Sequence, residues 1–93
     1  MYFVLLYEYV DNILEKRAPF RETHLELLNE YARRGELIFG GALTNPVDRS
    51  ISVFKADKKS LIEKFVENDP YVMNGLIAKW EIREWNVVVG SGI

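Results

Sequence analysis

The chain contains a single histidine, His24, whose position makes it the first candidate for chemistry. It lies in the stretch 19–34, PFRETHLELLNEYARR, whose apolar residues recur at helical spacing: Phe20, Leu27, Leu28 and Tyr31. His24 falls on the same stripe and therefore points toward whatever this helix packs on. An imidazole changes charge near neutral pH, which suits a general acid or base. A core histidine with both nitrogens hydrogen-bonded is the structural alternative.

Three further residues are candidates for binding a small molecule. Arg17 precedes the helix, where a guanidinium beside free helix N–H groups suits a substrate carboxylate, although a solvated base explains it as well. Arg21, in the first turn, is interpreted as a solvated base. Gly40 and Gly41 would let a ligand approach the backbone closely, but a β-bulge or tight sheet packing explains them equally well. The aromatic residues, Tyr7 among them, are assigned mainly to the core or to a dimer interface.

Four stretches have the composition of strands, and two have the pattern of amphipathic helices. The expected strands are 2–9, 36–44, 50–56 and 78–89, which are rich in β-branched and aromatic residues. The expected helices are 19–34, which Gly35 ends, and a second one that Asp57 caps at its N-terminus. Asp69 and Pro70 end the second helix and begin a short helical turn through residue 73. Residues 90–93 are expected to form a tail.

The resulting order, β-α-β-β-α-β, is that of the ferredoxin-like fold. This is an α+β domain with both helices on one face of a four-stranded antiparallel sheet. We expect one such domain over residues 1–93. Two helices cover only one face, yet the first two strands are apolar on both. A homodimer that buries the open sheet face, and so forms a dimeric α+β barrel, is the simplest way to cover that surface.

Composition argues against several classes of function. The net charge of -2 and the dispersed Lys and Arg residues disfavour nucleic-acid binding. No apolar run approaches the ~20 residues of a membrane helix, and the N-terminus does not resemble a signal peptide, so we expect a cytoplasmic protein. With no cysteine and one histidine, a tight transition-metal site is not expected. No phosphate-binding glycine loop or nucleophile motif is present, and no cofactor is expected.

Two segments, together with the opening strand, resemble the YciI-like (YCII-related) family. They are Leu14–Arg17 through Arg21–Leu25, and Asp69–Val72 through Gly75 and Leu76 to the last strand. The resemblance covers most of the chain. It implies a ferredoxin-like fold, a dimeric α+β barrel, and a cleft with a His and an Asp proposed as catalytic, which match His24 and Asp69. The family is related in fold to muconolactone isomerases, and some members are similar to chloromuconolactone dehalogenases.

Asp69 also has a structural interpretation. An aspartate before Pro70 can simply cap the helix that follows, a role worth about 1 kcal/mol. The functional interpretation has its carboxylate accept a hydrogen bond from the His24 ring, which fixes the tautomer and stabilises the imidazolium. In this fold both helices lie on the same face, so the two residues could meet near one end of the sheet.

We therefore weigh three hypotheses of function. The first is a cofactor-free enzyme that acts on a small organic acid or lactone by isomerisation, elimination (as in lyases and dehalogenases) or hydrolysis. Proton transfer by His24, assisted by Asp69, would drive that reaction. The second is a non-catalytic dimer that binds a small metabolite or a protein partner, with His24 in its core. The third is a dimeric-barrel monooxygenase or haem-handling relative, a class for which the sequence offers no cofactor motif.

Overall fold

The computed structural model describes residues 1–91; positions 92 and 93 of the expected tail lie outside the described residues. Four strands form one antiparallel sheet in the order β2-β3-β1-β4. They are β1 (Tyr2–Tyr9), β2 (Leu37–Ala42), β3 (Arg49–Lys55) and β4 (Ile77–Trp85). The helical elements are α1 (Ile13–Lys16), the 3-10 turn η1 (Ala18–Phe20), α2 (Arg21–Arg33), α3 (Lys59–Asn68) and α4 (Pro70–Met73).

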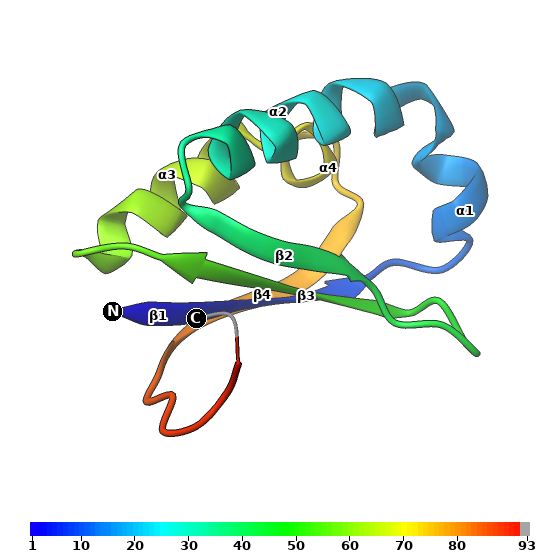
Figure 1. Cartoon of the computed structure of the whole chain (residues 1–93). Coiled ribbons are helices and arrows are strands. Elements are labelled where there is room, and N and C mark those ends of the chain that lie inside the picture. Colours follow the sequence, from blue (N-terminus) through cyan, green and yellow to red (C-terminus); the bar gives the residue numbers. More distant parts are fainter. Residues whose placement is uncertain (92–93) are drawn as a thin grey trace.

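The three helices α2, α3 and α4 lie over one face of the sheet, and within residues 1–91 no helix covers the other face (Figure 1). The strand order puts β1 and β3 in the centre, with the two βα crossovers on the same side. This is the ferredoxin-like α+β arrangement, so the fold class predicted from the sequence is confirmed.

Alternation along β1 separates the two faces of the sheet. Phe3, Leu5 and Tyr7 point toward the helices and are at most 4% exposed. Val4 and Leu6 lie between them on the opposite face and are half-buried. Because β1 is central and apolar on both sides, it forms the floor of the core and also the middle of the open face.

Three aromatic rings connect the long helices to the sheet. Tyr31 on α2, Phe54 on β3 and Phe65 on α3 contact one another edge to face, with centroids 5.1 to 6.2 Å apart. Phe54 and Phe65 are at most 1% exposed. Such contacts are geometrically specific, so they fix how α2 is rotated about its axis over the sheet. The apolar stripe of α2, which includes His24, faces inward as a result.

Two expectations about local structure are wrong. The last strand ends at Trp85 and not at residue 89, because Trp85 pairs with Tyr2, the first residue of the neighbouring strand, and residues 86–91 pair with no strand. From there the chain leaves the sheet and runs below it (Figure 1), with Val89 86% exposed. Asp57 does not cap α3, since the helix begins one residue later than expected and Lys58 occupies the N-cap without a side-chain bond.

Gly35, which follows α2 and its C-cap residue, adopts the left-handed conformation that commonly ends a helix, as the sequence predicts. Gly35 has a φ of +77°, and its N–H donates to the Ala32 carbonyl (3.0 Å). A side chain is disfavoured in this conformation by about 1 kcal/mol or more.

We therefore expect Gly35→Ala to lower the free energy of unfolding by about 1 kcal/mol. Gly41→Ala is the matched control, because a Cβ at Gly41 meets no atom within 4 Å and the backbone there is ordinary strand. Urea unfolding of both variants measures the difference. Equal stability of the two variants would contradict the strain assigned to Gly35.

Candidate active site

Asp69 is the buried centre of the site, with 0% of its surface exposed. Its carboxylate accepts three hydrogen bonds: from the Tyr7 hydroxyl (2.7 Å), from Nδ1–H of His24 (2.8 Å) and from the Tyr71 backbone N–H (3.0 Å). Each partner can donate, which suits an ionised carboxylate because that group only accepts. The bonds join β1, α2 and α4 at one point.

The backbone around Asp69 explains why the carboxylate lies there. The following Pro70 favours an extended conformation at Asp69, whose φ and ψ are -73° and 118°. The residue thus leaves α3 as its C-cap and begins α4 as its N-cap, with its side chain folded back onto the Tyr71 N–H. The capping role predicted from the sequence is confirmed, and the same carboxylate also contacts His24.

His24 is held in one orientation by two contacts. Its Nδ1–H is bonded to Asp69, and its ring stacks on Tyr71 with centroids 3.7 Å apart and an interplanar angle of 9°. The hydrogen bond selects the tautomer, and the stack fixes the ring plane. Nε2 is then the nitrogen available to a ligand, and the side chain is 12% exposed.

A cavity of about 180 Å³ adjoins His24 between α2 and the sheet. Its sheet side carries small residues, among them Gly40, Ser50 and Ser52, while α2 contributes Leu28 as well as His24. For comparison, an engineered apolar cavity of about 150 Å³ binds benzene. The space beside His24 is therefore of the size of a single six-membered ring with few substituents.

The two glycines predicted to contact a ligand both border this cavity. A Cβ on Gly40 would lie 2.8 Å from Oγ of Ser52, so close packing within the sheet requires a glycine there. Gly41 has open space around its Cα, and packing gives no reason for a glycine at this position. The β-bulge lies earlier in β2, between Leu37 and Phe39. A contact between either glycine and a substrate stays a prediction.

The two arginines near the start of α2 occupy different places. Arg21 is exposed, as a solvated base should be, but it also borders the cavity. Arg17 is half-buried between α1 and η1 and is not part of the cavity lining. The 3-10 turn explains the difference, because it separates Arg17 from the first turn of α2.

Tyr7 is a residue of the candidate site that the sequence patterns do not identify. Period-2 alternation indicated that it faces the helices, but no pattern linked it to Asp69, 62 residues away. Burial, with the Asp69 charge and hydrogen bond beside it, raises the pKa of Tyr7 far above its usual range. The hydroxyl therefore keeps its proton and remains a donor to Asp69 well beyond neutral pH.

Among residues 1–91, no group of three or more His, Cys, Asp or Glu side chains is placed to hold a metal ion. Within the same residues, no helix has the length and apolar character needed to cross a bilayer.

Comparison with known proteins identifies relatives of this arrangement. The family model of the YCII-related domain matches residues 1–86. The structure of 5-chloro-2-hydroxyhydroquinone dehydrochlorinase from Burkholderia phenoliruptrix AC1100, in complex with 2,5-dihydroxybenzoquinone, is similar with a TM-score of 0.78 and 22% identity, over 91% of this chain and 93% of that one. An Agrobacterium tumefaciens protein has a TM-score of 0.55 and 14% identity, over 88% of both chains. A search of curated proteins finds no match.

The raised pKa of Tyr7 predicts a pH dependence of stability. In the unfolded chain a tyrosine ionises near pH 10, whereas the folded protein holds the Tyr7 proton to higher pH. Above about pH 10 the folded state therefore binds more protons, and the free energy of unfolding falls as the pH rises further. The contribution of Tyr7 is at most about 1.4 kcal/mol per pH unit.

Tyr7→Phe tests this expectation. At pH 7 the variant should be about 1–3 kcal/mol less stable, because one oxygen of a fully buried carboxylate loses its donor. Above pH 10 its stability should decline less steeply than that of the wild type, since Tyr31 and Tyr71 remain in both proteins. Urea unfolding across the alkaline range measures both effects, and parallel declines would contradict the assignment.

Proposed function

Because the chain belongs to the YCII-related domain family, we propose that it is a small-molecule enzyme that works by acid–base chemistry without a cofactor. Its substrate is a small organic acid or lactone, and its reaction is an isomerisation, an elimination such as dehalogenation, or a hydrolysis. The observation that carries the proposal is the 2.8 Å contact between His24 and the buried Asp69 beside a ring-sized cavity.

The proposed proton transfer uses the free nitrogen of His24. Nε2 takes a proton from a carbon next to a substrate carbonyl, and the C–H electron pair becomes the C=C bond of an enolate. In an isomerisation the imidazolium returns the proton to another carbon of the same molecule. In an elimination the enolate expels a leaving group such as halide with its electron pair, and the proton passes to solvent. Asp69 stabilises the imidazolium through Nδ1–H.

The expected rate enhancement limits which substrates the proposed enzyme can act on. One positioned acid–base group contributes about 10²–10⁴-fold, so the abstracted proton must already be fairly acidic. A proton next to a carbonyl meets that condition. The similar dehydrochlorinase, whose structure holds the single-ring 2,5-dihydroxybenzoquinone, supports this class of substrate by analogy of fold.

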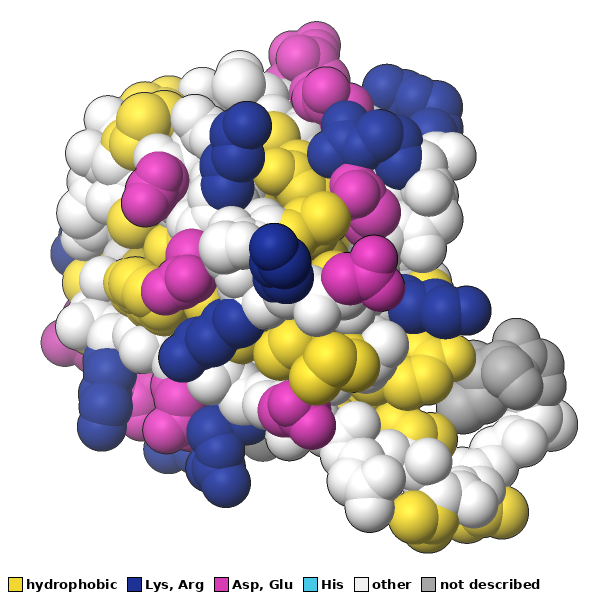
Figure 2. All heavy atoms as spheres, turned by 90° about the vertical axis from the view of Figure 1, so that its left-hand side faces the viewer, with side chains coloured by type: hydrophobic (Ala, Val, Ile, Leu, Met, Phe, Trp, Pro, Cys, Tyr) yellow, Lys and Arg dark blue, Asp and Glu magenta, His cyan; other side chains and the backbone are white. Residues whose placement is uncertain are grey.

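We propose that three further residues favour substrate binding. Gly40 and Gly41 border the cavity and leave its sheet side open to a flat ligand. Arg17 does not line the cavity, but its positive charge is near enough to Tyr71, which does, to lower the pKa of that residue. We do not propose nucleic acid as a partner, because acidic and basic side chains are interspersed over the end of the molecule seen in Figure 2.

We expect His24→Gln and Asp69→Asn to lower turnover by about 10²–10⁴-fold. The assay follows chloride release and ultraviolet absorbance on a panel of single-ring compounds, 5-chloro-2-hydroxyhydroquinone and unsaturated γ-lactones among them. Asn29→Gln, on the exposed side of α2, is the matched control and should keep wild-type turnover.

The alternative is a non-catalytic binding module with His24 as a core residue. It predicts that the wild type turns over no compound of the panel, and that His24→Ala mainly lowers the free energy of unfolding. Wild-type turnover in His24→Gln would therefore contradict the proposed enzyme, and so would failure of every compound in the panel.

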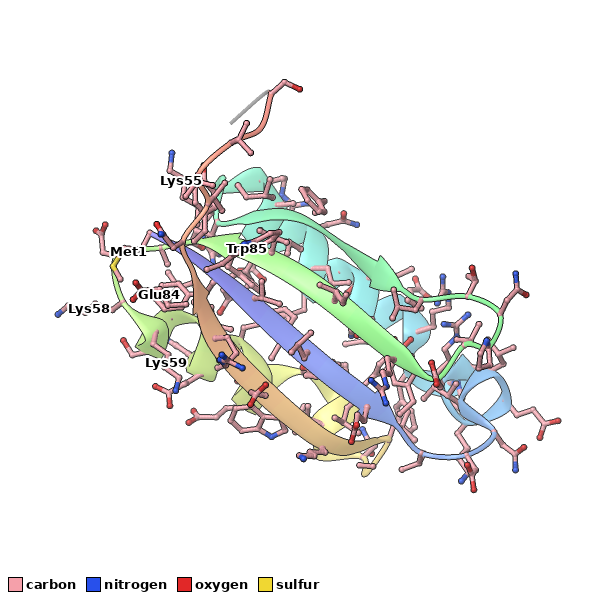
Figure 3. All side chains as sticks on the ribbon, turned by 90° about the horizontal axis from the view of Figure 1, so that it is seen from below. Met1, Lys55, Lys58, Lys59, Glu84 and Trp85 are labelled. Atoms are coloured by element: carbon pink, nitrogen blue, oxygen red, sulfur yellow. The ribbon has the colours of Figure 1, made fainter. Side chains whose placement is uncertain are left out.

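We further propose that the protein acts as a homodimer through the open face of the sheet. That face presents Val4 and Leu6 of β1, both half-buried, and Ile51 of β3, which pairs with Leu6. Phe39, 63% exposed, lies at its edge. In Figure 3, which views this face, Trp85 lies at the end where Met1 and Lys55 are found. An apolar surface of this kind is usually covered in soluble proteins, and a second copy covers it symmetrically.

Leu6→Arg should convert the dimer into a monomer, because it places a charge in the middle of the apolar face. Thr23→Arg introduces the same side chain on the exposed surface of α2 and should leave the dimer intact. Light scattering after gel filtration distinguishes the 10.8 kDa chain from a species of twice that mass. A monomeric wild type at high concentration would overturn the proposed dimer.

A further inference from the structure

We propose that Arg21 and the Tyr71 hydroxyl form a subsite for an ionised oxygen of the ligand, a carboxylate or a phenolate. The subsite lies where the first turn of α2 borders the cavity beside His24. This inference rests on the proposed function in one respect only: the ligand of the subsite is the substrate.

The first observation is the buried, unpartnered hydroxyl of Tyr71. The residue is 1% exposed, and its hydroxyl oxygen forms no hydrogen bond with residues 1–91. Buried polar atoms nearly always have a partner, and one without a partner in the free protein is a position that a ligand can satisfy. The Tyr71 ring borders the cavity and stacks on His24, so a ligand bound to its hydroxyl would lie close to the imidazole.

The second observation is the positive charge around this hydroxyl. Burial raises the pKa of Tyr71, while Arg21 and Arg17 both lower it, which requires both guanidinium groups to lie near the phenol. Arg21 borders the cavity and forms no ion pair within residues 1–91. Its guanidinium lies next to the Tyr71 hydroxyl, close enough to lower the pKa of Tyr71 as a hydrogen-bond donor, and its other N–H groups are available to a ligand.

A guanidinium only donates hydrogen bonds, and a neutral phenol donates one readily, so both groups need a hydrogen-bond acceptor. Their common partner is an acceptor, and the charge of Arg21 favours an anionic one. No Asp or Glu of the described chain borders the cavity to compete for that position; Asp69 lies behind His24 and Tyr71, with its oxygens already bonded.

The position of this subsite also has a chemical consequence. An anionic oxygen held by Arg21 and Tyr71 would place the adjoining carbons of a single-ring ligand next to His24. Negative charge that develops on the ligand as Nε2 takes a proton would then lie beside a fixed cation. The subsite would select acids and phenols over neutral compounds of the same shape.

Binding of benzoate and of benzyl alcohol tests the proposal. The two probes share a ring and differ in charge, and the ring C–H resonances of the one histidine report their binding by NMR. We expect benzoate to bind the wild type about ten- to a hundredfold more tightly than benzyl alcohol. Arg21→Gln should remove this preference, and Tyr71→Phe, which keeps the ring stacked on His24, should reduce it.

Arg33→Gln is the matched control, because it removes the same charge from the exposed far end of α2. An equal loss of benzoate affinity in Arg33→Gln and Arg21→Gln would overturn the subsite, as would equal affinity of the two probes or no binding of benzoate. Binding that depends on Arg21 in a protein without turnover would leave the subsite in place and overturn the proposed function. Turnover without binding that depends on Arg21 would overturn the subsite and leave the proposed function in place.

Discussion

A carboxylate that is removed from water must receive hydrogen bonds from its surroundings, and this requirement at Asp69 governs the structure. Its oxygens are fully buried and take donors from β1, α2 and α4. A shift of any one element would leave a buried charge short of a donor, which is costly. The bonds that stabilise the fold at this point are also the bonds that orient His24, so stability and chemistry depend on the same contacts.

The same carboxylate resolves a choice that the sequence left open. Asp69 caps α4 through the Tyr71 N–H and also receives Nδ1–H of His24. The two roles are compatible because a carboxylate offers several lone pairs, and here one oxygen accepts both bonds while Tyr7 occupies the other. Tyr71 contributes twice as well, with its backbone to Asp69 and its ring to His24.

Sequence patterns were sufficient for features that depend on neighbouring residues. The helical stripe placed His24 on the inner side of α2, and the order of strands and helices predicted the fold. Contacts across the chain were not accessible in this way: alternation told which face Tyr7 occupies but not that it meets Asp69. The valines after Trp85 favour a strand locally, yet they have no neighbouring strand to pair with, so propensity failed there. The sequence predicts a solvated base at Arg21 because a helical stripe does not show where a cavity opens.

The central claim is that Asp69 holds His24 with its proton on Nδ1 and leaves Nε2 free. Nitrogen-15 NMR of the one histidine tests it most directly, because the two ring nitrogens have distinct shifts when protonated and when free. For the neutral ring we expect a proton on Nδ1 and a free Nε2 in the wild type, with this preference weakened in Asp69→Asn. A proton on Nε2 in the wild type, or the same tautomer balance in both proteins, would contradict the account.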